Sequence, residues 1–158
     1  MSNSRQFCTF FLDNLLFGVE LQKVQEVIRY LDLTAVPLAH SVVSGLMNLR
    51  GQIVTAVDLR RRLELEERSQ GTLPMNVVVR TSDGAVSMLV DDIGDVVEVE
   101  EETFERPPET LRGKIRSVIL GVHKLDKHLM HVLDTDKVCE ATDENNTSPL
   151  RAMPASVQ

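Results

Sequence analysis

Three histidines that lie close together are the first residues that could do chemistry. His123, His128 and His131 surround Asp126 and Lys127, and a hairpin there could bring two imidazoles together as metal ligands. If His128 and His131 share one strand, however, their spacing of three points them to opposite faces. The pattern favours ordinary polar positions on an edge hairpin, and we expect neither a bound metal nor another cofactor.

An acidic run in the second half is the other candidate for catalysis or calcium binding. It lacks the D-x-D-x-D-G loop of an EF-hand, and strand alternation would place much of it on a solvated face. The chain also has no G-x-S-x-G elbow and no Gly-rich phosphate loop. These observations favour a non-enzymatic binding module. A small metal-dependent hydrolase using His123, His128 and the acidic cluster is the alternative from a different class. The acidic run comprises Asp91, Asp92, Asp95, Glu98, Glu100, Glu101 and Glu102.

A lone arginine on a glycine turn is the most informative feature. Arg50 and Gly51 come directly before the apolar run at residues 53–57, whose β-branched side chains predict a strand. Gly51 can take a positive φ, so the chain can enter that strand sharply. Arg50 is therefore predicted to project from a rigid scaffold. It is either a solvated charge that keeps a turn soluble or an anchor for a protein partner.

Composition restricts the function classes further. The 158 residues carry a net charge of −7 and no Trp, which argues against a nucleic-acid partner, because phosphate binding needs a basic face. Cys8 and Cys139 form no C-x-x-C motif and fit a reducing compartment. We expect a cytoplasmic protein without membrane insertion, since the chain has no apolar signal core or apolar stretch of membrane-spanning length.

The elements that must position Arg50 are predicted to be mainly β, with short helices. Residues 7–12 and 15–19 should form a hairpin around Asp13-Asn14, and residues 77–79 and 86–90 should form strands. Helical spacing at residues 21–28 suggests a short amphipathic turn or helix, and residues 41–49 could form a helix broken near Gly45. Asp58 is a predicted N-cap for a helix over residues 58–63, and a polar loop should follow over residues 66–74.

The chain also looks duplicated, with a second half starting near residue 75. The Leu21-x-x-Val24-x-Glu26 pattern is echoed from Val90 onward. A second set of residues recurs 76 positions later: Gly45, Leu49, Ile53, Val54, Val57 and Asp58 correspond to Gly121, Leu125, Leu129, Met130, Leu133 and Asp134. Two related β halves that cannot close a core alone are expected to pack together. Residues 141–158 are almost free of large apolar side chains, which predicts a disordered tail.

Together these residues resemble the CheW family of chemotaxis coupling proteins, over roughly residues 6–140. The motifs that carry the resemblance are Phe10-Phe11-Leu12, Phe17-Gly18-Val19-Glu20, Lys23-Val24-Gln25-Glu26-Val27-Ile28, Thr34-Ala35-Val36-Pro37, the stretch from Gly45 to Val54 with its Asn48-Leu49-Arg50-Gly51, Val57-Asp58-Leu59-Arg60, the stretch from Leu89 to Val97, and Val132-Leu133-Asp134. Thr55 departs from the pattern, because many family members have proline there.

The resemblance implies an all-β fold of two packed five-stranded SH3-like barrels. It also implies a non-enzymatic adaptor that binds the regulatory domain of a CheA-type histidine kinase and the cytoplasmic tip of chemoreceptors in an array. The output could be flagellar motility, pilus motility or a second messenger. For receptor binding it implies Arg50, Gly51, Val24, Glu26 and Leu21. For kinase binding it implies Gly45 and Gly121, although close backbone packing explains both glycines equally well.

Overall fold

Ten strands form two five-stranded sheets in the part of the chain that this computed structural model describes, residues 3–37, 39 and 41–140. The tail predicted at residues 141–158 lies outside the described residues. Sheet A has the order β8 (Asp92–Glu100), β1 (Ser4–Leu12), β2 (Leu15–Glu20), β10 (Leu129–Leu133), β9 (Ile119–Lys124). Sheet B has the order β3 (Val24–Ile28), β6 (Met75–Thr81), β7 (Gly84–Val90), β5 (Gln52–Asp58), β4 (Val43–Leu49).

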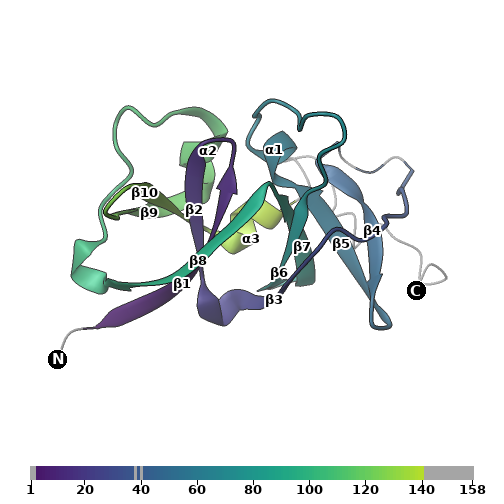
Figure 1. The fold of residues 1–158 in the computed structure, drawn as a ribbon, viewed down its shortest axis with the longest axis horizontal. Helices are drawn as coiled ribbons and strands as arrows, with labels where there is room; N and C mark the ends of the chain where they lie inside the picture. Colours follow the sequence, from purple (N-terminus) through teal and green to yellow (C-terminus); the bar gives the residue numbers. More distant parts are fainter. Residues whose placement is uncertain (1–2, 38, 40, 141–158) are drawn as a thin grey trace.

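The two sheets repeat one topology. In each, two antiparallel pairs are followed by a parallel pair and a last antiparallel pair. The registers also repeat: Gly45 lies opposite Ala56 in sheet B, and Gly121 lies opposite Val132 in sheet A. Each sheet takes strands from both sequence halves, because β3, β4 and β5 join β6 and β7, whereas β8, β9 and β10 join β1 and β2. Figure 1 shows the two sheets side by side.

The core explains why several strands are almost wholly apolar. One buried cluster lies within sheet A and contains Phe7 and Met130, and a second lies within sheet B and contains Met47 and Val78. The largest cluster joins side chains of both sheets, including Phe10. Strand β1 therefore sends Phe7 to one cluster and Phe10 to another, so both of its faces are buried. This packing of two barrels against each other gives an all-β fold with SH3-like subdomains, as predicted.

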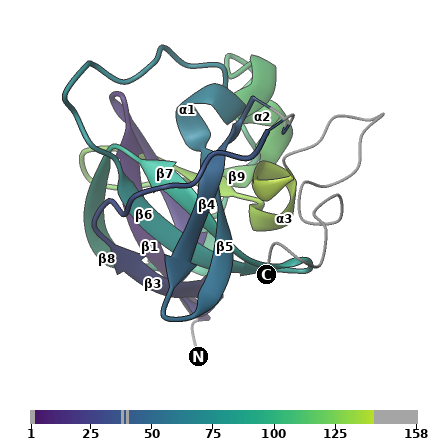
Figure 2. The same ribbon diagram turned by 90° about the vertical axis from the view of Figure 1, so that its right-hand side faces the viewer.

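Five short helical segments complete the described chain. The 3-10 turns are η1 (Leu21–Lys23) and η2 (Glu101–Thr103), and the α-helices are α1 (Leu59–Arg62), α2 (Gly113–Val118) and α3 (Thr135–Cys139). In Figure 2, α1 lies toward the top of the molecule and α3 lies to the right of β7. None of the helices in the described residues has the length and apolar character that crossing a bilayer requires.

One helix prediction was wrong, and the prediction of a short turn or helix over residues 21–28 holds only for its first three residues. Residues 41–49, predicted as a broken helix, contain strand β4, in which Gly45 has a φ of 154°, a positive value that side chains rarely adopt, and Leu46 pairs with Thr34 outside the sheet. Residues 21–28 form only the three-residue η1 before strand β3. In both segments pairing with a partner strand outweighs a weak local helical pattern. The capped helix was confirmed, because the Asp58 side chain accepts a hydrogen bond from the Arg60 backbone N–H.

Candidate partner-binding site

Arg50 lies at the tip of the β4–β5 hairpin. Leu49 pairs with Gln52, so Arg50 and Gly51 are the two residues of the turn. Their φ angles are 53° and 87°, as a type I′ turn requires, and the Gly51 backbone N–H donates to Asn48 Oδ1 at 2.8 Å. The predicted positive φ of Gly51 is confirmed. A positive φ at Arg50 was not foreseen, and it is unusual for a residue with a long side chain.

Arg50 forms an ion pair with Glu26 of strand β3. The Arg50 Nη2 atom donates to Glu26 Oε2, although Arg50 lies in the β4–β5 turn and Glu26 lies on β3. The Arg50 side chain is 70% exposed, whereas that of Glu26 is 18% exposed. The Glu26 carboxylate therefore orients the guanidinium of Arg50 and leaves most of this side chain accessible to a partner. This places two of the predicted receptor-binding residues in direct contact.

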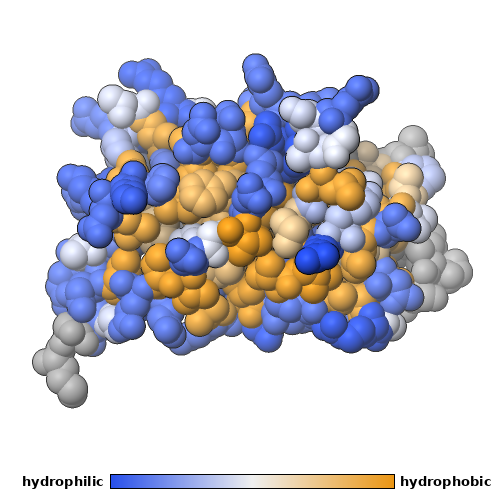
Figure 3. Space-filling view, viewed as in Figure 1, coloured by the Kyte–Doolittle hydropathy of each residue, from blue (hydrophilic) through white to orange (hydrophobic). Residues whose placement is uncertain are grey.

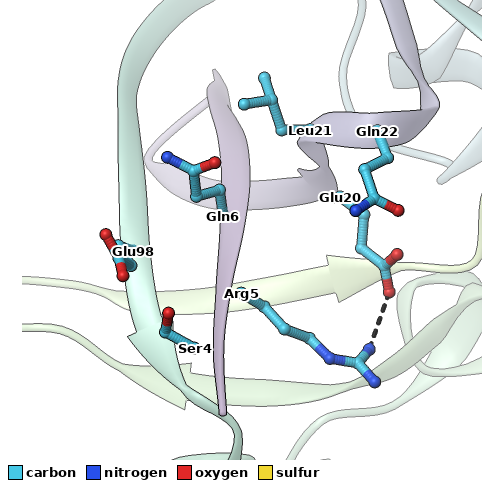
Figure 4. Close-up of a pocket in the computed structure, with 7 residues that line it drawn as sticks. All are labelled: Ser4, Arg5, Gln6, Glu20, Leu21, Gln22 and Glu98. Carbon is cyan, nitrogen blue, oxygen red and sulfur yellow. Dashed lines mark hydrogen bonds and ion pairs between the residues drawn. The ribbon is translucent and has the colours of Figure 1, made fainter. Parts of the chain in front are cut away.

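Leu21 and Val24 occupy different surroundings. Val24 opens β3 and packs, partly buried, against the large core cluster. Leu21 belongs to η1 and lines a pocket of about 680 Å³ at the edge of sheet A, where it is the one apolar side chain among seven lining residues. Figure 4 shows Glu98, Gln6 and the Arg5–Glu20 ion pair around the same space. The remaining lining residues are Ser4 and Gln22.

Apolar side chains gather on the face that carries β8 and β3. Figure 3 shows orange residues across the middle of this face, with hydrophilic residues above and below them. Val96 of β8 is 54% exposed and Val27 of β3 is 36% exposed. Exposed apolar surface together with an exposed charge, such as that of Arg50, is typical of a docking surface for a protein.

The two predicted kinase-contact glycines are both buried. A Cβ at Gly45 would lie 2.6 Å from the Thr34 carbonyl oxygen, and one at Gly121 would lie 2.4 Å from the Glu105 carbonyl oxygen. At each site an outlying segment pairs with the strand, Thr34 with Leu46 and Glu105 with Val122. Close backbone approach therefore accounts for both glycines.

An ionic network at the junction of the sheets was missed in the sequence. Asp91 connects β7 to β8 and accepts hydrogen bonds from Arg60 Nε at 2.9 Å, Arg68 Nε at 3.0 Å and the Asp13 backbone N–H at 2.7 Å. Burial by itself would raise the pKa of Asp91, but the hydrogen bonds from Arg60, Asp13 and Arg68 outweigh it and lower the pKa. Strand alternation predicts that much of the acidic run lies on a solvated face, and nothing in the local sequence distinguishes Asp91 from Asp92.

The three histidines do not converge. His131 is buried and its Nδ1 donates to the Leu16 carbonyl at 2.9 Å, His123 is buried beside Thr103, and His128 is exposed. Among the described residues no group of three or more His, Cys, Asp or Glu side chains could hold a metal ion. Their geometry is that of packed or solvated polar side chains.

Comparisons with known proteins place the chain in one family. The family model of the CheW-like domain matches residues 6–143. The chemotaxis protein CheW of Treponema pallidum is 28% identical over 137 residues, 84% of this chain and 81% of that protein. The CheW of Thermotoga maritima is 30% identical over 132 residues, 84% of this chain and 85% of that protein.

A solved structure shares the fold. The crystal structure of the scaffolding protein TtCheW from Thermoanaerobacter tengcongensis aligns with a TM-score of 0.81 and 22% identity, and covers 94% of this chain and 99% of that chain. The repeated five-stranded sheets, the capped α1 and the Arg50 hairpin thus occur in a chain whose match to the family extends over nearly all of its described part. The chain belongs to the CheW-like domain family.

Proposed function

We propose that this protein is a chemotaxis coupling adaptor that links the cytoplasmic tip of chemoreceptors to the regulatory domain of a CheA-type histidine kinase. Membership of the CheW-like family and the names of its relatives support this function. The adaptor acts by binding rather than by catalysis, and it works in the cytoplasm next to membrane-bound receptor arrays.

The observation that carries the receptor contact is the backbone of Arg50. Type I′ turns favour Asn, Asp or Gly at their first central position, and another residue with a positive φ costs about 1 kcal/mol. Arg50 nevertheless holds a φ of 53° with its side chain 70% exposed. In the other half the corresponding turn is Asp126-Lys127, and neither residue has a positive φ. Folding of such a turn does not require arginine, so recognition of a partner explains it better.

The receptor tip would lie against η1, β3 and the β4–β5 hairpin. These elements follow the lower side of the molecule in Figure 1, and Glu26 and Arg50 connect two of them. A helical hairpin needs an apolar floor and an orienting charge. Val24 and Leu21 would contribute to the floor, and Arg50 with Gly51 would supply the charged edge. Affinity for one receptor would be modest, with avidity from repeated contacts in an array.

Kinase contacts near Gly45 and Gly121 stay a prediction. Substitution of either glycine would displace the backbone of Thr34 or Glu105, so a loss of kinase binding in such variants would report on folding as well. A test of this contact therefore needs substitutions of exposed neighbours rather than of the glycines.

Binding of a chemoreceptor cytoplasmic fragment tests the receptor contact. Arg50→Glu should weaken that binding at least about tenfold, as expected for a central charged anchor. Arg112→Glu is the matched control, because Arg112 is exposed and has no ion pair within the described residues. Unfolding curves should show that both variants fold. Equal receptor affinity of Arg50→Glu and the wild type would refute the assignment of Arg50.

A further inference from the structure

A second cavity, separate from the Arg50 hairpin, opens at the end of sheet A. It has a volume of about 350 Å³ and an apolar interior formed by Phe7, Phe104, Leu120 and Val132, with His123 in its wall. Arg5 stands at the rim and is paired with Glu20 at 2.9 Å and with Glu101 at 3.0 Å. Polar groups at the rim and apolar groups inside are the usual composition of a ligand site.

The hydrogen bonds of Thr103 determine which ring nitrogen of His123 carries the proton. The Thr103 hydroxyl lies 2.8 Å from the Glu100 carbonyl oxygen and 3.0 Å from His123 Nδ1. A hydroxyl has a single proton, and a carbonyl can only accept. Both bonds form together only when Thr103 donates to Glu100 and accepts from His123 Nδ1–H. His123 is then the tautomer whose Nε2 carries a lone pair.

This Nε2 acceptor has no partner among the described residues. His123 is only 2% exposed, and it lines the cavity between the rings of Phe7 and Phe104, whose centroids lie 5.6 Å and 5.2 Å from its own. Burial, followed by the charge of Arg5, lowers the pKa of His123, so the ring is neutral near pH 7. The Nε2 atom is not among the fully enclosed unpaired atoms of the described residues, so a donor placed in the cavity can reach it.

The corresponding end of sheet B is filled. His123 pairs with Met130 across β9 and β10, and in the same register Met47 pairs with Val54 across β4 and β5. Met47 packs in a cluster with Leu49, and Leu33 packs partly buried against that cluster. One barrel therefore closes its end with aliphatic side chains, whereas the other presents a cavity with a polar acceptor.

We propose that this cavity, bounded by Phe104, Leu120 and His123, receives a tyrosine or tryptophan side chain of a protein partner, whose O–H or N–H donates to His123 Nε2. An aromatic ring fits the apolar walls and the edges of Phe7 and Phe104, and its polar tip satisfies the acceptor. The volume is at the lower end of the roughly 300–1,000 Å³ of small-molecule sites, which suits one side chain.

The residues around the mouth of the cavity indicate that its occupant belongs to a protein. Phe104 is 42% exposed and Leu120 is 49% exposed, so apolar surface continues outside the cavity, and the Arg5 ion pairs border it. Anchoring aromatics surrounded by such a rim are typical of protein interfaces. The chain has no Trp, and its single tyrosine, Tyr30, is partly buried. The anchor therefore comes from another protein, and this inference does not depend on the receptor contact of Arg50.

Binding of side-chain analogues to the full chain, followed by NMR, tests the proposal. p-Cresol or 3-methylindole should shift the resonances of His123 and Phe104, and at least one should bind about fivefold more tightly than toluene, which lacks the donor. N-acetyl-tyrosinamide should bind no more weakly than p-cresol. If p-cresol binds but the amide does not, the cavity accepts only free small molecules, and the protein partner is wrong.

Two variants separate the cavity from other surfaces. Leu120→Glu at the mouth should abolish binding of p-cresol, whereas Leu73→Glu, at another exposed leucine, should leave it unchanged. His123→Phe should remove the preference for p-cresol over toluene. If His123→Phe does not fold, the comparison of Leu120→Glu with Leu73→Glu still tests the proposal. The proposal would be overturned if the wild type bound toluene as tightly as both p-cresol and 3-methylindole, or if Leu120→Glu bound p-cresol as the wild type does.

Discussion

Arg50 combines an unfavourable backbone conformation with an exposed charge, and this combination predicts a conflict between stability and function. Arg50→Asn should fold at least as stably as the wild type and gain up to about 1 kcal/mol, because Asn tolerates a positive φ. Loss of the exposed pair with Glu26 offsets little of that gain. The same variant should bind the receptor fragment more weakly. Urea unfolding measures the stability of Arg50→Asn, and the binding assay measures its affinity for the receptor fragment. If Arg50→Asn were less stable than the wild type, Arg50 would contribute to the stability of the fold.

Thr55 has a hydroxyl group that the structure leaves without a hydrogen-bond partner. The side chain is 2% exposed in the interior strand β5, and its Oγ1 is buried without a hydrogen-bond partner. Thr55→Val keeps the shape and removes the unpaired group, so it should raise the free energy of unfolding by about 1 kcal/mol. Denaturant titration measures this, and a lower midpoint would show that the hydroxyl has a partner after all.

His123 predicts how stability changes near neutral pH. Its folded pKa lies below the ordinary 6.5, so between the two values the unfolded chain binds more protons than the folded one. The free energy of unfolding should therefore fall as the pH drops from about 7 through 6.5 towards the folded pKa. His123→Gln should flatten this part of the curve. If the free energy of unfolding of His123→Gln depended on pH as that of the wild type does, His123 would not be the group responsible.

At the scale of elements, Asp91 ties the β7–β8 connection to α1, to the loop carrying Arg68 and to the β1–β2 turn. Asp91→Asn leaves the mostly buried Arg60 and Arg68 short of a charge partner, which should cost about 2–3 kcal/mol. The pKa of Asp91 is lowered, so its contribution is present above the unfolded value of 3.8 and is lost as the pH falls through the folded value.

The neighbouring acid provides the control for this network. Asp92→Asn changes an exposed carboxylate that has no hydrogen bond or ion pair within the described residues, so it should alter stability by less than about 0.5 kcal/mol. Equal effects of the two variants in urea unfolding would show that the network contributes nothing specific.

Elements with strong local signals could be predicted from the sequence, and others could not. The Asp13-Asn14 hairpin and the helix capped by Asp58 follow from turn and capping chemistry that acts over a few residues. Strand β4 was mistaken for a helix because its partners, β5 and Thr34, lie outside the segment. The Arg50–Glu26 pair and the Asp91 network join residues brought together only by folding, so no local pattern predicts them.

At the scale of the whole molecule, both sheets depend on strands from both halves of the sequence. Fragments ending and restarting in the loop at residues 64–74 would each lack strands of both sheets. Each fragment alone should therefore be unfolded, and mixing them should restore β structure, because the shared core forms only when both are present. Circular dichroism of the separate and mixed fragments checks this. A fragment that folds cooperatively alone would show that the halves are independent units.

As a coupling adaptor, the folded molecule is expected to link a receptor to a kinase and so to change the activity of that kinase. The most direct measurement is the rate of kinase autophosphorylation in membranes that contain a chemoreceptor, with the CheA-type kinase and this protein added. We expect a rate several-fold above that without the protein, and we expect this increase to be retained by Arg112→Glu and lost in Arg50→Glu. If the wild-type protein gave no increase with the receptor and kinase of the same organism, it would not be a coupling adaptor for them.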